Sequence, residues 1–142
     1  MSYQLSAALQ GAVYRALRSD DRLGALVGDA IFDAMPVSAP SGTYVALGPE
    51  EVTDAGDMTG GGSRHDFVVS VLSGADEAGG FAGVKAAAAA VSAALEDGDV
   101  QTDAGRVAGL WFLRARARRS DGGTGRRVDL TFRARLDLGQ KH

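Results

Sequence analysis

The segment RVAGLWFLRARARR at residues 106–119 and the segment VDLTFRARLDL at residues 128–138 decide the fold of this chain. In both segments apolar and polar residues alternate, which is the pattern of a β-strand with one buried face. The residues between them, SDGGTG at 120–125, have the composition of a turn, and Asp-Gly is a strong hairpin signal. We therefore expect a long antiparallel hairpin at the C-terminal end of the sequence.

The alternation assigns the side chains of this hairpin to two faces. In the first strand one predicted face carries Val107, Trp111, Leu113, Ala115 and Ala117, and the other carries Leu110, Phe112, Arg114, Arg116 and Arg118. In the second strand the predicted inner face carries Val128, Leu130, Phe132, Ala134 and Leu136, while Thr131, Arg133 and Arg135 point outward. The positions of the aromatic residues are typical of core packing. The outer face and tip of the hairpin are therefore expected to be densely basic.

The rest of the sequence predicts helices and shorter strands. Apolar residues at helical spacing predict an amphipathic helix over residues 2–17, and a capping signal at residues 19–21 predicts a short helix ending at Val27. An alanine-rich helix is expected over residues 83–96, and strands over residues 31–35, 43–48 and 65–73. Residues 50–64 are interpreted as a long flexible loop or a hairpin arm. Together these elements predict an α+β fold, an antiparallel β-sheet with helices packed on one face, in a single domain spanning residues 1–142.

Composition narrows the possible functions. The chain has 142 residues, of which 45% are hydrophobic and 23% charged, with two histidines and no cysteine. The absence of cysteine excludes disulfides, thiol nucleophiles and cysteine-based zinc sites. No stretch approaches the roughly 18 consecutive apolar residues that a membrane span requires, and the first residues do not form an export signal. We expect no cofactor, no metal ion and no membrane contact.

Charge is divided unevenly along the chain. Residues 1–105 contain five basic and fifteen acidic residues, a net charge of −10, whereas residues 106–142 contain ten basic and three acidic residues, a net charge of +7. Such a division favours contact with a partner of opposite charge, either nucleic acid or the acidic surface of another copy of the chain. Arginine suits an interface because its guanidinium makes bidentate contacts with carboxylates and phosphates.

Three other groups of residues carry the residue types of a functional site. The run GGGSRH at residues 60–65 lacks the lysine and the following helix of a phosphate-binding loop, which favours an ordinary glycine-rich loop. Ser63, His65 and Asp66 have the residue types of a hydrolase triad, although adjacent residues of a strand point to opposite faces. The acidic residues at 50–57 do not have the spacing of a calcium loop, so a solvated acidic loop is the better interpretation.

The order of these segments resembles the tail-terminator, or tail-completion, proteins of long-tailed phages and of gene transfer agents. The resemblance rests on LQGAVY at residues 9–14, DRLGALVG at 21–28, IFD at 31–33, YVALG at 44–48, HDFVVSV at 65–71, VSAAL at 91–95 and GRVAGLWF at 105–112. It covers nearly the whole chain. It implies a structural protein without enzymatic activity or cofactor, whose fold is a sheet with helices packed on it.

The resemblance also implies partners and a location. Six copies are expected to form a ring that caps the tail tube, joins the head-side connector or stopper protein and lets DNA pass through its lumen. The particle would be assembled in the bacterial cytoplasm. The residues expected at the subunit interface or the lumen are Arg114, Arg116, Arg118, Arg119, Arg126, Arg127, Arg133 and Arg135. The expected docking loop contains Glu50, Glu51, Asp54, Asp57, Gly60, Gly61 and Gly62. The alternative is a small nucleic-acid-binding domain that uses the same basic hairpin.

Overall fold

The computed structural model of the chain describes residues 2–56, 60–74, 81–98, 100–120 and 125–139. The helical elements are the 3-10 helix η1 (Ser2–Leu5) and the α-helices α1 (Ser6–Arg18), α2 (Asp21–Val27) and α3 (Ala82–Glu96). The strands are β1 (Ile31–Phe32), β2 (Tyr44–Asp54), β3 (Gly61–Leu72), β4 (Arg106–Ser120) and β5 (Gly125–Gly139).

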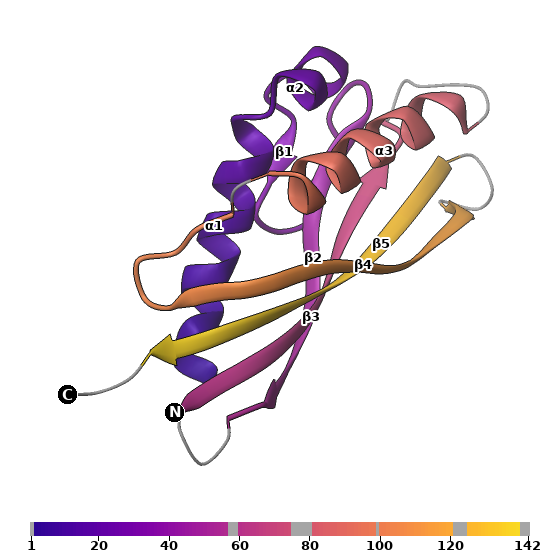
Figure 1. Cartoon of the computed structure of the whole chain (residues 1–142). Helices are drawn as coiled ribbons and strands as arrows, with labels where there is room; N and C mark the ends of the chain where they lie inside the picture. The colour runs from indigo at the N-terminus through magenta and orange to yellow at the C-terminus, as the bar shows by residue number, and fades with distance from the viewer. Residues whose placement is uncertain (1, 57–59, 75–80, 99, 121–124, 140–142) are drawn as a thin grey trace.

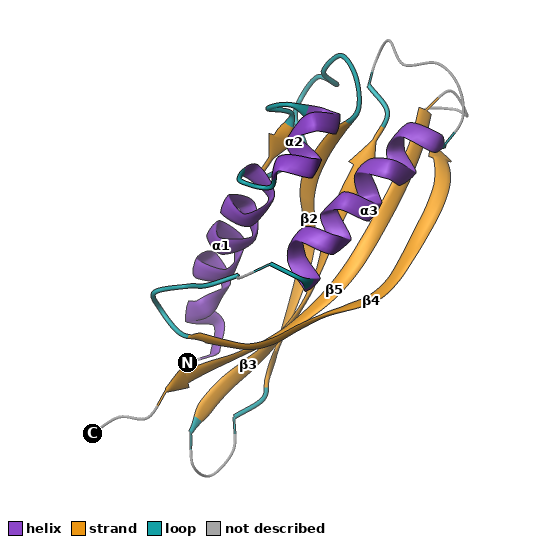
Figure 2. Ribbon diagram, turned by 45° about the horizontal axis from the view of Figure 1, so that its top comes forward, coloured by secondary structure: helices purple, strands orange, loops and turns teal. Residues whose placement is uncertain are grey.

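These strands form one twisted sheet in the order β1-β2-β3-β5-β4, and the helices lie on one face of it (Figures 1 and 2). All neighbouring strands are antiparallel except β1, which runs parallel to β2 through two residue pairs. The predicted α+β fold and the long C-terminal hairpin of β4 and β5 are thus confirmed. The sequence predicts a strand over residues 31–35, whereas the observed strand β1 ends at Phe32. Because β1 and β4 are the two edge strands, the basic hairpin forms one side of the sheet.

The N-terminal helices follow the signals in their sequence. In α1 the residues Leu9, Val13 and Leu17 are buried, as the helical spacing of the apolar residues predicts. Asp20 caps α2 by accepting a hydrogen bond from the backbone N–H of Leu23 at 2.9 Å. The helix ends at Gly28, whose φ of 61° is costly for residues with a Cβ.

The core lies between the helices and the inner face of the sheet. In α3 the small residues Ala87, Ala90 and Val91 are buried, so this helix packs closely on the sheet. Phe132 of β5 is fully buried and stacks on Phe67 of β3 with ring centroids 5.7 Å apart. All five β5 residues predicted to face inward are buried.

Two irregularities in β4 overturn part of the predicted face assignment. The pairing with β5 shifts register between Val107 and Gly109 and again between Phe112 and Arg114. Each β-bulge adds one unpaired residue, which reverses the alternation that follows it. Directly paired residues share a face, so Phe112 lies beside the buried Phe132, and Trp111 lies beside Arg133 on the outer face. Trp111 and Phe112 are also 49% and 39% exposed, so the expectation that both belong to the core is wrong.

The segment at residues 50–64 is the second correction. Strand β2 continues through Asp54 and β3 begins at Gly61, and the two strands pair from Glu50 opposite Phe67 to Asp54 opposite Ser63. The hairpin-arm interpretation is therefore confirmed, and the flexible-loop interpretation is wrong for these strand residues. Asp57 lies outside the described residues.

Candidate functional site

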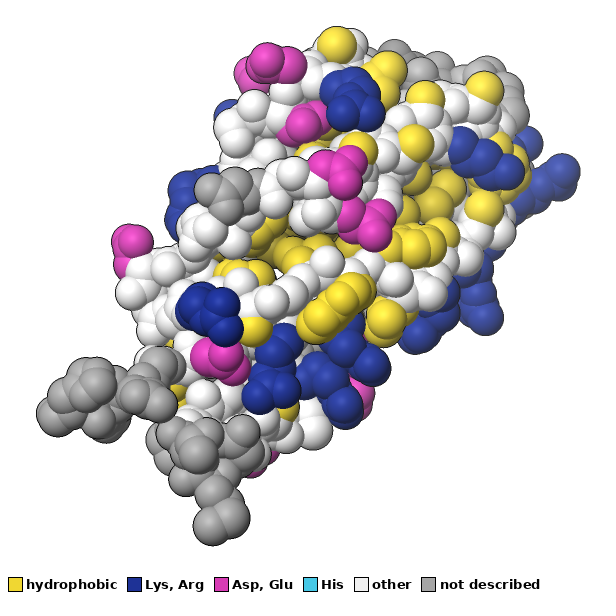
Figure 3. Space-filling model, viewed as in Figure 1, with side chains coloured by type: hydrophobic (Ala, Val, Ile, Leu, Met, Phe, Trp, Pro, Cys, Tyr) yellow, Lys and Arg dark blue, Asp and Glu magenta, His cyan; other side chains and the backbone are white. Residues whose placement is uncertain are grey.

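The outer face of β3, β5 and β4 is a strongly charged surface of the described structure. No helix covers this face, and the strand register places on it a ladder of arginines with a few carboxylates between them. The outward basic residues are Arg64, Arg106, Arg114, Arg116, Arg118, Arg127, Arg133 and Arg135, and the outward acidic residues on the same strands are Asp66, Asp129 and Asp137. We call this surface the arginine face. In Figure 3 the basic side chains gather on the side of β4 and β5, and the acidic ones lie mainly toward α2 and the end of α3.

Half of the eight arginines predicted for the interface bind carboxylates of their own chain. Arg133 holds Asp66 in a bidentate pair, with Nε and one terminal nitrogen at 2.8 and 3.0 Å from the two carboxylate oxygens. Arg118 and Arg127 share Asp129, at 3.3 and 2.8 Å. The remaining pair joins Arg135 Nε to Asp137 Oδ1 at 3.4 Å, a distance typical of a loose contact. The arginine face is therefore partly neutralised from within.

These pairs change the ionisation of the carboxylates. Hydrogen bonds from Arg133 outweigh a smaller effect of burial and lower the pKa of Asp66 below its ordinary value of 3.8. Burial raises the pKa of Asp129, but hydrogen bonds from Ser70 and Arg127 outweigh it and the net pKa is lowered. Both groups are consequently negative at neutral pH and orient the guanidinium groups around them.

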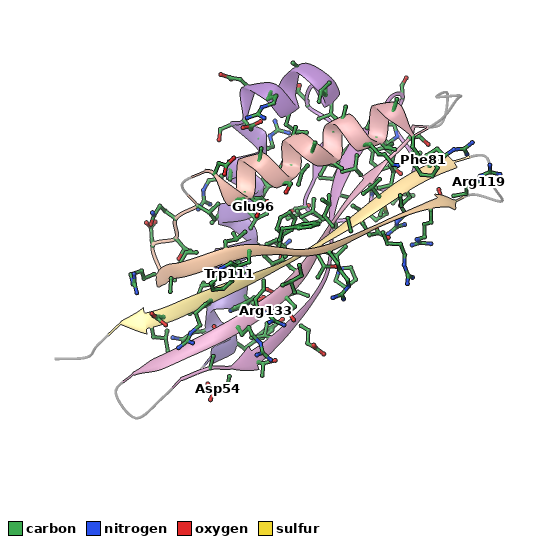
Figure 4. The ribbon with its side chains drawn as sticks, turned by 45° about the vertical axis from the view of Figure 1, so that its right-hand side comes forward. Asp54, Phe81, Glu96, Trp111, Arg119 and Arg133 are labelled. Carbon is green, nitrogen blue, oxygen red and sulfur yellow. The ribbon has the colours of Figure 1, made fainter. Side chains whose placement is uncertain are left out.

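The other predicted arginines fall into two groups. Arg114 and Arg116 lie on the arginine face and form no ion pair with any residue in the described ranges. Arg119 and Arg126 are paired with each other across the hairpin and lie on the side of the helices, so they are not on the outer face. The guanidinium of Arg126 stacks over the ring of Phe81, 5.5 Å from its centroid. Figure 4 shows Arg119 and Phe81 at the same end of the sheet.

Trp111 adds an aromatic group to the arginine face. Its indole lies over the backbone at Gly109, where a Cβ would come within 2.5 Å of the indole Cζ2 atom. Trp111 pairs directly with Arg133, and Figure 4 shows both near the middle of the sheet. Regular alternation along β4 predicts that Trp111 faces the helices. Trp111 lies on the outer face because the segment between the two bulges has the reverse alternation.

The predicted docking segment is divided between the two faces of the β2–β3 arm. Glu51 and Asp54 are exposed, and Gly60, Gly61 and Gly62 lie at the distal end of the arm. Glu50 instead turns inward, where its carboxylate accepts a hydrogen bond from Ser6 Oγ and lies 3.0 Å from His65 Nδ1. Glu51 and Asp54 are therefore exposed on the arm, whereas the carboxylate of Glu50 is engaged by Ser6 and His65.

A chain of polar side chains runs from Ser6, at the start of α1, into the arm; Ser6, Ser63 and His65 are buried, whereas Glu50 is partly exposed. A carboxylate can only accept, so His65 donates from Nδ1 to Glu50, and its Nε2 forms a hydrogen bond with Ser63 Oγ at 2.7 Å. Burial raises the pKa of Glu50, but the hydrogen bonds from His65 and Ser6 outweigh it, so the pKa falls below its ordinary value of 4.5. We call Ser6, Glu50, His65 and Ser63 the buried relay. The sequence prediction placed Glu50 and Ser63 in the segment at residues 50–64 and did not connect Glu50 with His65; the start of β3 at Gly61 is what puts Ser63 and His65 on one face of a strand.

The buried relay has the connectivity of a serine hydrolase triad, but the described structure closes it off. Ser63 and His65 are both 0% exposed, so no substrate carbonyl can approach the hydroxyl. A cavity of about 60 Å³ between α1 and the sheet touches Glu50 but is not lined by Ser63 or His65. Asp66, the third residue of the predicted triad, points to the opposite face and binds Arg133. The buried relay thus joins η1 and α1 to the hairpin arm.

Other kinds of site are not formed in the described part of the chain. Its His, Asp and Glu residues form no cluster of three that could hold a metal ion. None of its helices combines the length and the apolar character needed to cross a membrane. The arginine face, with Trp111 among its charged side chains, is the candidate interaction surface of the described sheet.

Comparisons with known proteins identify the family. The family of tail completion protein gp17 matches residues 11–137, so the chain belongs to that family. The chain is also similar to a solved structure described as the virion of a native gene transfer agent particle. The identity is 57%, the TM-score is 0.86, and the alignment covers 96% of this chain and 99% of that one. Comparison with curated proteins returned no match. The predicted resemblance to tail-completion proteins is confirmed, and the protein is a structural component of a phage-type tail.

Proposed function

We propose that the chain is a ring-forming tail terminator that works without catalysis or cofactor. In this proposal residues 1–142 act as one domain, about six copies close into a ring on the end of the tail tube, and the ring joins the head-side connector of a phage or gene-transfer-agent particle. DNA passes through the lumen without sequence-specific contacts. The observation that carries the proposal is the 57% identity, over 96% of the chain, to a protein of a gene transfer agent virion.

The distribution of charge supports association from head to tail. Strands β4 and β5 carry nine arginines and two aspartates, a net charge of +7, at one side of the sheet. Residues 1–56, which form the elements from η1 to β2, carry three arginines and seven acidic residues, a net charge of −4. A contact between two different surfaces of the same subunit is heterologous. Repeated heterologous contacts form a closed ring when the rotation from one subunit to the next adds up to a full turn.

The arm of β2 and β3 supports contact with a second kind of partner. It extends past the end of α1 in Figure 1, and its exposed residues Glu51 and Asp54 are acidic. In the proposal this arm meets the tail tube protein or the connector, while the arginine face serves the neighbouring subunit or the lumen. The buried relay holds the base of the arm on the N-terminal helix, so the arm keeps a fixed direction.

The test is the assembly state of the purified chain. Size-exclusion chromatography with multi-angle light scattering should show a species of about six copies, and negative-stain electron microscopy should show rings with a central opening. Because the proposed contacts are electrostatic, the fraction of the ring should fall as salt rises. A chain that remains monomeric at low salt and high concentration, both alone and with purified tail tube, would contradict the proposal.

A nucleic-acid-binding domain is the second candidate, and Trp111 favours it. An exposed indole among arginines is the combination that stacks on bases and neutralises phosphates. Against this, Asp66, Asp129 and Asp137 already occupy part of the arginine face. Fluorescence anisotropy with short single- and double-stranded DNA separates the two functions. Binding that falls steeply with salt and is lost in Arg114→Ala supports a nucleic-acid domain, whereas absence of binding at low salt removes it.

A further inference from the structure

Large apolar side chains are exposed at two opposite edges of the described sheet. At the β4 edge Trp111, Phe112 and Leu113 are between 36% and 49% exposed. At the β1 edge Met35 and Val37, in the segment after β1, are 45% and 106% exposed, and Leu26 of α2 is 48% exposed. Apolar groups exposed in this way mark interaction surfaces when they gather inside a polar rim.

The β4 group has the features of an interface centre. It lies next to the second bulge, where Leu113 has no direct partner on β5, and the first bulge, between Val107 and Gly109, puts Trp111 on the outer face. The ring of Trp111 rests on Gly109. Arg114 and Arg116 follow along the strand, and neither forms an ion pair with another described residue. Trp and Arg are the residue types that carry most binding energy in protein interfaces. As the edge strand of the sheet, β4 also has a free backbone edge along its length.

The β1 edge has the complementary character. The register pairs β1 with Val45 and Ala46 of β2, and in the described structure no other strand pairs with β2 along this edge. Asp29 and Asp33, which flank β1 in the sequence, are exposed, and the elements from η1 to β2 are negative overall. A basic edge with an apolar centre and an acidic edge with an apolar centre thus lie on opposite sides of one subunit.

We propose that the β4 edge of one copy packs on the β1 edge of the next. Trp111 and Leu113 then contact the apolar surface made by Leu26, Met35 and Val37, and the unpaired arginines face the carboxylates that flank β1. This inference rests on the proposed ring, but it goes further by naming the two edges and their central residues. Because the edges differ, the contact is heterologous and each copy uses both.

Two variants test the contact, each with one edge disabled. The first, Trp111→Ser with Leu113→Ser, disables the β4 edge, and the second, Met35→Ser with Val37→Ser, disables the β1 edge. All four side chains are more than a third exposed, and Phe112 is left intact because it packs on Phe132. The matched control is Tyr3→Ser, since Tyr3 is 70% exposed but lies in η1. Circular dichroism and thermal unfolding confirm that the variants are folded.

The expected result is specific to a heterologous contact. Each variant alone should be monomeric, with self-association weakened at least ten-fold, whereas the control should assemble as the unmodified chain does. Mixed together, the two variants should form a heterodimer of one copy each that grows no further, because only one working edge of each kind remains. Rings that persist in either variant overturn the inference and leave the proposed function intact. A second variant that dimerises with itself, or a mixture that stays monomeric at low salt and high protein concentration, also overturns it. A third outcome separates the two proposals: if the mixed variants form heterodimers but the unmodified chain forms only open filaments, the edge-to-edge contact is supported and the proposed ring is contradicted.

Discussion

Replacing Glu50 with alanine should destabilise the protein strongly, although Glu50 lies on a strand whose neighbouring residues are exposed. The carboxylate is the acceptor for His65 Nδ1, at 3.0 Å, and for Ser6 Oγ. His65 is 0% exposed in the folded chain, so removal of the carboxylate takes away the acceptor of a buried donor. A buried donor without a partner costs about 1–3 kcal/mol, and the lost bond to Ser6 adds about 0.5–1.5 kcal/mol. We expect a loss of about 2–4 kcal/mol in the free energy of unfolding, or about 6–12 °C in Tm for a chain of this size.

Urea unfolding followed by circular dichroism measures this loss, and Glu51→Ala is the matched control. Glu51 is the adjacent residue, is exposed and faces the other side of the sheet, so its removal should change the free energy of unfolding by less than about 0.5 kcal/mol. Glu50→Gln keeps one oxygen acceptor, so its free energy of unfolding should lie between those of Glu50→Ala and Glu51→Ala. If Glu50→Ala and Glu51→Ala unfold at the same urea concentration, the buried relay does not stabilise the fold and the reasoning is refuted.

The same relay predicts a pH dependence. The pKa of Glu50 is lower in the folded chain than its ordinary value of 4.5, so the unfolded chain binds the proton more readily. The stabilisation from Glu50 is therefore complete above about pH 4.5 and is lost as the pH falls through the lower folded pKa. In Glu50→Gln the free energy of unfolding, measured by urea unfolding across pH, should therefore fall less steeply below about pH 4.5 than in the unmodified chain.

Three further predictions concern single features of the fold. Asp20→Ala should cost about 1 kcal/mol in urea unfolding because it removes the cap of α2. Gly74→Ala should cost about 1–3 kcal/mol or more, because a Cβ there would lie 2.2 Å from a backbone oxygen, whereas Gly24→Ala in α2, where a Cβ meets nothing within 4 Å, should stabilise the protein by about 0.4–1 kcal/mol. Asp66→Asn and Asp129→Asn should each reduce the loss of stability below about pH 3.8, measured by thermal unfolding across pH, because both carboxylates have lowered pKa values in the folded chain.

The sequence predicts the elements that depend on local signals. The amphipathic spacing of α1, the cap at Asp20 and the alternation in β5 each act within a few residues, and each is found in the structure. The order of the segments also led to the family. Local signals could not reveal the parallel pairing of β1 with β2, because it depends on a strand of two residues held by tertiary contacts.

The incorrect face assignment in β4 and the overlooked role of Glu50 have a common origin, because both depend on the register between neighbouring strands. Strand β4 has the same alternating pattern as β5, but its two bulges reverse the alternation twice. Gly109 is a sequence signal for the first bulge, whereas nothing in the composition marks the second one, between Phe112 and Arg114. Glu50 reads as one of several acidic residues until the pairing of β2 with β3 places it beside His65. Predictions of faces therefore fail where the partner strand, rather than the strand itself, decides which way a side chain points.

The carboxylates within the arginine face bear on how strong a subunit contact can be. Seven outward arginines on β4 and β5 without counterions would repel one another, and Asp129 and Asp137 reduce that repulsion while fixing the guanidinium groups beside them. Fixed guanidinium groups lose less side-chain entropy on binding, but fewer of them are left to attract a neighbour. A single contact between copies should consequently be weak and sensitive to salt. Ring closure compensates for this weakness, because a subunit that is held at both edges dissociates only when two contacts break together. The partial internal pairing of the arginines is thus compatible with a stable ring, and it favours complete rings over dimers.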